Sequence, residues 1–145
     1  MKIISACLLG VNCRFNGKNK FSPKAKHVFD GGEVILICPE MLINLGIPRE
    51  ACEIVGGDGF DVLEGKARVV SKSGKDFTQL YLDAAQKASA MIENLGITKA
   101  YLKSGSPTCG AGTIYNGDFT GEKKNGFGVF SALLKNNGIE LVEID

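Results

Sequence analysis

The sequence predicts an α/β fold, a single three-layer sandwich built on a small parallel sheet. Four short apolar runs are typical of strands, at residues 2–6, 33–37, 98–103 and 139–144. Segments with helical spacing separate them, and strands that alternate with helices form parallel sheets with right-handed crossovers. We expect the sheet order 2-1-3-4, with strands numbered along the chain, in one domain over residues 1–145.

Two helices are predicted before the middle of the chain. Ser22 and Pro23 are typical of an N-cap and a first helical turn, and Gly31 follows the last apolar position of this helix. Pro39 is expected to open a second, short helix that continues through Leu45.

Two further helices are predicted in the second half. The first covers 76–95, where apolar residues follow helical spacing and where Asp76 and Gln79 have the spacing of a capping box. The second covers about 126–137.

The stretch 47–75 is rich in glycine and charge and interrupts this alternation. It contains two short β-like pieces, FDVLEG at 60–65 and ARVVS at 67–71. We interpret them as a hairpin inserted beside the sheet.

Composition excludes several classes of function. The net charge is +1, so no large basic field is available to bind a nucleic-acid duplex. The apolar run at the N-terminus is short and continues into polar residues, which indicates a buried first strand rather than a signal peptide. No apolar run is long enough to cross a bilayer. We expect a cytosolic protein that binds a small molecule and neither duplex nucleic acid nor a membrane.

The chain has five cysteines, an odd number, and no CxxC pair. Without a secretion signal, a disulfide framework is not expected, and metal binding or catalysis explains the cysteines better. Three of them follow predicted strands: Cys7, Cys38 and Cys109. The carboxyl ends of parallel strands share one edge of a sheet, where ligands bind in folds of this kind. We therefore expect these three thiols to meet.

Three thiolates with no fourth obligatory partner favour a soft metal or an iron–sulfur cluster that keeps one coordination position open. Cys38 directly precedes a predicted helix, whose free N–H groups are expected to lower the pKa of its thiol. We expect Cys13 to pack within its loop rather than serve as an accessory ligand, and Cys52 to be structural.

The order of several motifs resembles the thiouracil desulfidase family. The motifs are SACLLG from Ser5, CPE from Cys38, CEIVGG from Cys52, SPTCG from Ser106 and YNGDFTG from Tyr115. The resemblance extends from Cys7 to the final helix. It implies an enzyme that removes sulfur from thiolated uracil compounds and releases hydrogen sulfide, with a [4Fe–4S] cluster held by three cysteines.

Matched motif by motif, the resemblance places the cluster ligands at Cys7, Cys38 and Cys109 and the catalytic residues at Glu40 and Ser106. Glu40 would act as general base and then acid, and Ser106 would hydrogen-bond the substrate ring or relay a proton. The expected reaction is hydrolysis without net electron transfer. Taken alone, Glu40 could merely complement a helix dipole and Ser106 could merely shape a turn.

Two arginines flank the cysteine segments, Arg14 and Arg49, and are candidates for binding a substrate phosphate, with surface solvation as the alternative. The sequence departs from the family pattern at Asn16 and at 48–51, which bears on the identity of the substrate. Two other classes of function remain open at this point. One is a non-catalytic metal- or nucleotide-binding module, and the other is a sulfur carrier or redox sensor that uses one reactive thiol.

Overall fold

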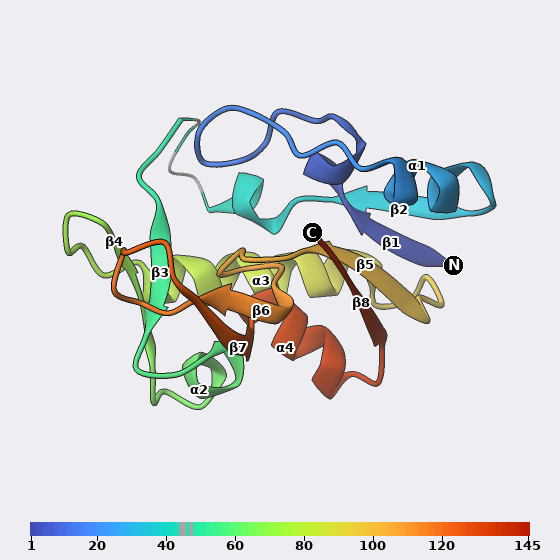
Figure 1. Ribbon diagram of the computed structural model, residues 1–145. Helices are drawn as coiled ribbons and strands as arrows, with labels where there is room; N and C mark the ends of the chain where they lie inside the picture. The colour runs from blue at the N-terminus through green and yellow to red at the C-terminus, as the bar shows by residue number, and fades with distance from the viewer. Residues whose placement is uncertain (44–45, 47) are drawn as a thin grey trace.

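The computed structural model describes residues 1–43, 46 and 48–145 (Figure 1). Its main sheet has four parallel strands in the order β2-β1-β5-β8. The strands are β1 (Lys2–Ser5), β2 (Val34–Ile37), β5 (Lys99–Lys103) and β8 (Glu140–Ile144). These are the four predicted strands, so the predicted order 2-1-3-4 is confirmed.

Helices cover both faces of this sheet, which confirms the three-layer sandwich (Figure 1). Consecutive residues of a strand point to opposite faces. Ile4 of β1 packs in a core cluster with Ala25 of α1 (Pro23–Asp30). Ile3 packs in the other cluster, with residues of α3 (Thr78–Ile92) and α4 (Val129–Asn136).

The helix starts are partly as predicted. The Ser22 hydroxyl accepts the Ala25 N–H at 3.2 Å and caps α1, as expected. The capping box predicted for α3 is wrong, because the helix begins at Thr78. The Gln79 side-chain amide donates to the Asp83 carboxylate instead of capping the helix. Pro39 opens a 3-10 helix, η2 (Pro39–Leu42), with Ile43 as its C-cap, and the last residues of the predicted helix, 44–45, lie outside the described residues.

Two antiparallel hairpins lie at the end of the molecule opposite the N-terminus (Figure 1). The inserted hairpin pairs β3 (Cys52–Val55) with β4 (Arg68–Ser71). The prediction of a strand at 60–65 is wrong, because α2 (Gly59–Leu63) occupies this stretch. A second hairpin was not predicted and pairs β6 (Ala111–Tyr115) with β7 (Lys123–Phe127).

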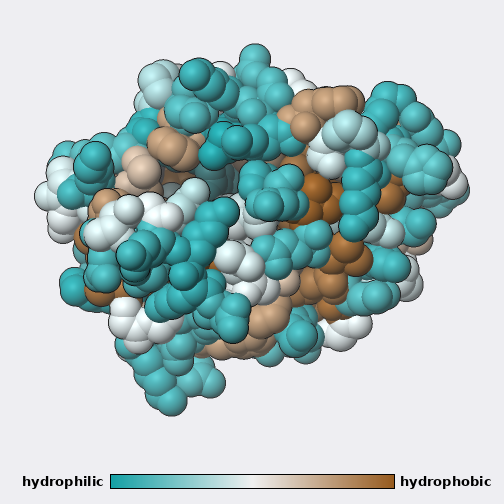
Figure 2. Space-filling model, viewed as in Figure 1, coloured by the Kyte–Doolittle hydropathy of each residue, from teal (hydrophilic) through white to brown (hydrophobic). Residues whose placement is uncertain are grey.

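The strand β2 lies at the edge of the sheet, with a neighbour on one side only. Its apolar run is not fully buried, since Leu36 is 40% exposed. The face drawn in Figure 2 is mainly hydrophilic, with hydrophobic residues gathered toward the side of β1 and β8. Across residues 1–43, 46 and 48–145, no helix combines the length and apolar character that crossing a membrane requires.

Candidate active site

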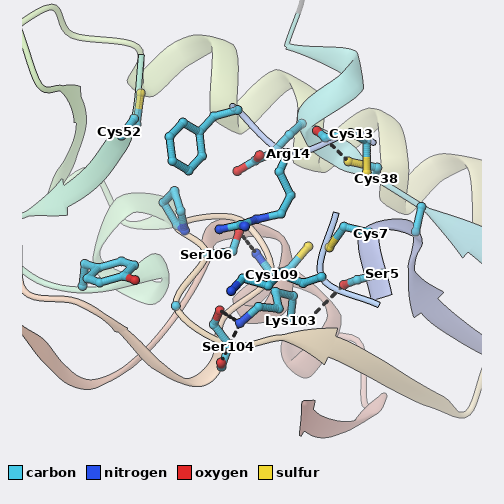
Figure 3. Close-up of a pocket in the computed structure, with 18 of the residues that line it drawn as sticks. Ser5, Cys7, Cys13, Arg14, Cys38, Cys52, Lys103, Ser104, Ser106 and Cys109 are labelled. Atoms are coloured by element: carbon cyan, nitrogen blue, oxygen red, sulfur yellow. Dashed lines mark hydrogen bonds between the residues drawn. The ribbon is translucent and has the colours of Figure 1, made fainter. Parts of the chain in front are cut away.

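A cavity of about 590 Å³ lies at the carboxyl ends of β1 and β5, between η2 and the two hairpins. All five cysteines line it, and none forms a disulfide. Figure 3 shows the sulfurs of Cys7 and Cys109 pointing toward one another, with Cys13 and Cys38 beside them and Cys52 on the far side. The sheet edge therefore gathers the three predicted thiols, and the structure adds Cys13 to the group.

Cys7 lies on a short 3-10 helix, η1 (Ala6–Leu9), that directly continues β1. Gly10 ends η1 with φ +91°, a left-handed conformation that a residue without Cβ adopts at low cost. The chain then returns, and Lys20 donates its backbone N–H to the Cys7 carbonyl at 2.9 Å. This return folds the 11–20 loop over Cys7 and carries Cys13 to it.

Cys38 is the residue that precedes η2, and its thiol donates to the Cys13 carbonyl at 3.8 Å. The expected lowering of its pKa is wrong for the metal-free chain. The interaction with the Cys13 side chain and burial both raise the pKa of Cys38, and they outweigh the opposing effect of the Met41 N–H. A bound metal changes this balance, because a coordinated thiol is deprotonated.

Cys109 is held by a loop that is fixed by hydrogen bonds within itself and by further ones to the start of α4. The Ser106 hydroxyl oxygen accepts the N–H of Thr108 at 3.0 Å and of Cys109 at 2.9 Å. The carbonyls of Pro107 and Thr108 accept the N–H groups of Val129 and Phe130 at the start of α4. The loop thus satisfies donors that a helix N-terminus leaves unpaired, and the helix fixes the loop in return.

Gly128 allows this close approach of loop and helix. A Cβ at this position would lie 2.4 Å from the carbonyl carbon and oxygen of Thr108. Burial, followed by the neighbouring Cys38, raises the pKa of the Cys109 thiol. The metal-free chain therefore keeps Cys109 as a neutral thiol close to two others.

This set of donors suits a soft metal centre, since thiolates select zinc, copper(I) or iron–sulfur clusters. Within the described ranges, no group of three His, Cys, Asp or Glu side chains is arranged to hold a single metal ion. The ligands of a multi-iron cluster bind different iron atoms and need not converge on one point. The cysteine-lined cavity thus fits a cluster, and Cys7, Cys38 and Cys109 are candidate donors from three separate segments.

Glu40 also lines the cavity, two residues after Cys38. Its carboxylate accepts one hydrogen bond from the Arg49 guanidinium at 2.5 Å and one from the Thr108 hydroxyl at 3.2 Å. Arg49 itself is not among the lining residues, and its side chain is only 4% exposed. The structure therefore places Arg49 behind Glu40 rather than on the cavity wall.

Four cationic side chains line the cavity, Arg14, Lys20, Lys103 and Lys123. Burial lowers the pKa of Lys103, whose ammonium donates to the carbonyl and hydroxyl oxygens of Ser104 at 3.0 and 3.1 Å. These four cations, called the cationic wall below, outnumber by one the acidic side chains that line the same cavity, which are Glu40, Glu53 and Asp145.

Sequence reasoning had identified only Arg14 among these four cations. Lys103 could have been found, because it ends a predicted parallel strand next to the SPTCG loop. Lys123 could not, since it belongs to the hairpin that was not predicted.

These features define a class of protein: an α/β domain with a cysteine-lined cavity at the carboxyl edge of its parallel sheet. The chain belongs to the 2-thiouracil desulfurase family, whose model matches residues 3–145. The protein YbbK of Bacillus subtilis (strain 168), of uncharacterized function, is 43% identical over 142 residues, which cover 98% of this chain and 94% of YbbK.

A solved structure, that of the [4Fe-4S]-dependent thiouracil desulfidase TudS, resembles this fold with a TM-score of 0.83 and 36% identity. The similarity covers 97% of this chain and 88% of the TudS chain. The family resemblance inferred from the motifs is therefore confirmed.

Proposed function

We propose that this chain is a [4Fe–4S]-dependent desulfidase that removes sulfur from a thiolated uracil base or nucleotide by hydrolysis. The observation that carries the proposal is the meeting of Cys7, Cys38 and Cys109 on one cavity wall beside Glu40. Membership of the desulfurase family and the similarity to TudS support it.

In this proposal Cys7, Cys38 and Cys109 hold the cluster, and each comes from a different segment at the sheet edge. When bound, the cluster supplies an iron atom without a protein ligand, a Lewis acid for the soft sulfur of a thiocarbonyl. Cys13 and Cys52 are not needed as ligands.

Glu40 is the general base. Its carboxylate faces the cavity, takes a proton from water as the water oxygen attacks the thiocarbonyl carbon, and returns a proton to the departing sulfur. Water and the thiocarbonyl become a carbonyl and hydrogen sulfide, so atoms balance and no electrons are gained or lost.

Ser106 supports this chemistry through its hydroxyl proton. The oxygen already accepts two backbone N–H groups, which leaves the O–H as the donor available toward the cavity. We propose that this O–H bonds the pyrimidine ring and orients it for attack.

The cationic wall extends the proposal to nucleotides. Arg14 and the three lysines line the cavity. The negative charge of Glu40 is compensated by its ion pair with Arg49. Glu53, another acidic lining residue, accepts the N–H groups of Gly117 and Phe119, and Asp145, the third, accepts the Ser104 hydroxyl. A phosphate would therefore find donors on this wall, with Arg14 as the one able to bind it in a bidentate manner.

The test is sulfide release from thiolated uracil bases, nucleosides and nucleotides by protein prepared without oxygen. Wild-type chain is expected to release one sulfide per uracil product formed. Cys7→Ala and Glu40→Ala are expected to abolish release, and the exposed Glu64→Ala to leave it unchanged. Turnover retained by Cys7→Ala or Glu40→Ala would refute the assignment, and colourless, zinc-containing wild type would favour a binding module.

A further inference from the structure

Arg49 and Glu40 form a buried ion pair behind the cavity. Their side chains are 4% and 15% exposed, and the guanidinium nitrogen lies 2.5 Å from the carboxylate oxygen. In each other ion pair of the described residues, at least one side chain is more than half exposed. Exposed pairs contribute little to stability, whereas removing one partner of a buried pair leaves an uncompensated charge.

The carboxylate of Glu40 is held at both oxygens. One oxygen accepts from Arg49, and the other accepts the Thr108 hydroxyl at 3.2 Å. Thr108 directly precedes Cys109 and belongs to the loop fixed on α4. Two anchors from different parts of the chain thus determine the direction in which the carboxylate points.

Arg49 is fixed from its own backbone as well. Its N–H donates to the Phe15 carbonyl at 2.7 Å, which ties Arg49 to the loop that carries Cys13 and Arg14. Arg49 therefore links the 11–20 loop, through its backbone, to Glu40, through its guanidinium. A substrate in the cavity meets Glu40 rather than Arg49, which is not a lining residue.

We propose that Arg49 is a positioning residue for Glu40, with Thr108 as its second anchor, and that it does not bind substrate phosphate. The proposal rests on the proposed role of Glu40 as the base. A misplaced catalytic group costs turnover without changing substrate affinity, by about 100-fold for a displacement near 1 Å. The substrate would still bind to the cavity wall.

The experiment compares Arg49→Lys, Arg49→Ala and Thr108→Val with the exposed control Arg68→Ala. Each is assayed on a thiolated uracil base and on its nucleotide. Arg49→Ala is expected to lower kcat about 100-fold on both substrates with KM unchanged, and added guanidinium ion to restore part of the kcat in a saturable manner. Arg49→Lys keeps the charge but not the planar donor group, so its loss is expected to be smaller.

A loss confined to the nucleotide and to its KM would overturn the proposal, because it would mark Arg49 as a phosphate ligand. An unchanged kcat, or no rescue by guanidinium, would overturn it too. If Arg49→Ala does not fold, the kcat losses of Arg49→Lys and Thr108→Val decide the question. If wild type releases no sulfide from any thiolated uracil, the proposed function fails instead.

A second readout does not depend on turnover. Thermal unfolding of wild type, Glu40→Gln, Arg49→Met and the double variant gives the coupling between the two side chains. The double variant is expected to melt at a higher temperature than the sum of the two single losses predicts. Strictly additive losses would contradict the pairing.

Discussion

The hydroxyl oxygen of Ser106 accepts the backbone N–H of Cys109, a proposed cluster ligand, at 2.9 Å. The same oxygen accepts the N–H of Thr108 at 3.0 Å. Shaping the turn and acting on the substrate were alternatives for Ser106 when the sequence was considered alone. In the structure the two roles are compatible. The hydroxyl oxygen accepts the backbone N–H groups of the loop, and the hydroxyl proton can still be donated to a substrate.

Ser106→Ala is therefore expected to affect both the loop and the chemistry. Two N–H groups lose their acceptor, which costs about 1–3 kcal/mol when such groups are buried. We expect faster loss of iron from anaerobic protein, followed by absorbance, and a kcat below that of wild type even when iron content is matched.

Ser104→Ala is the matched control, since the Ser104 hydroxyl donates to Asp145 and lies in the same cavity. Its iron loss is expected to match wild type. Equal iron loss in Ser106→Ala and Ser104→Ala would contradict the role assigned to the Ser106 oxygen.

Gly128→Ala is expected to displace the loop that carries Cys109. The new Cβ would lie 2.4 Å from backbone atoms of Thr108, which cannot rotate away. Overpacking of this kind costs about 1–3 kcal/mol, measurable as a lower midpoint of denaturant unfolding. Gly32→Ala, at a site where a Cβ meets nothing within 4 Å, is the control and is expected to unfold like wild type. A Gly128→Ala midpoint equal to that of wild type would count against this packing.

The buried thiols make the stability of the metal-free chain depend on pH. The Cys38 hydrogen bond lowers the pKa of Cys13, but the Cys7 thiol and burial outweigh it and raise this pKa from about 9 to about 11. The folded chain then keeps a proton that the unfolded chain has released. The contribution of this thiol to stability is therefore full below about pH 9 and is lost as pH rises toward 11.

Thermal unfolding of metal-free protein between about pH 8 and pH 10.5 measures this effect, and Cys13→Ser is the comparison. Wild type is expected to lose melting temperature across this range, and Cys13→Ser to lose less because it lacks one titrating thiol. A wild-type melting temperature that is constant or rising would contradict the burial of these thiols beside one another.

Arg14→Gln tests the cationic wall. The Arg14 side chain lines the cavity, and its loss removes a bidentate donor for phosphate. We expect a KM increase of about tenfold for a thiolated uracil nucleotide, the size of one charged hydrogen bond, and little change for the free base. Equal changes of KM for both substrates would show that Arg14 does not bind the phosphate.

The parallel sheet and the meeting of its strand-end cysteines could be predicted, because both follow from local patterns and from general rules of topology. Apolar runs marked the four strands, and their alternation with helices predicted a parallel sheet, whose strands have their carboxyl ends at one edge. The α2 helix was missed because Asp58 and Asp61 form a capping box that overrides the β-like residues after it. The β6–β7 hairpin was missed because KKNGF lacks an alternating apolar pattern.

The roles of Cys13 and Arg49 could not be predicted, because both depend on long-range packing. Cys13 reaches Cys38 only through the return of the 11–20 loop, held by backbone bonds to Cys7 and Leu8. Arg49 was considered as a phosphate ligand, and only the folded chain places it behind Glu40. Charged residues in loops carry no pattern that shows which partner they meet.

The most direct test of this account is the iron and acid-labile sulfide content of anaerobically reconstituted protein, compared among single cysteine variants. Wild type and Cys52→Ser are expected to be brown and to hold the iron and sulfide of one cubane cluster per chain. Cys7→Ser, Cys38→Ser and Cys109→Ser are each expected to lose most of it. Wild type without iron, or Cys109→Ser with the full content, would contradict the account.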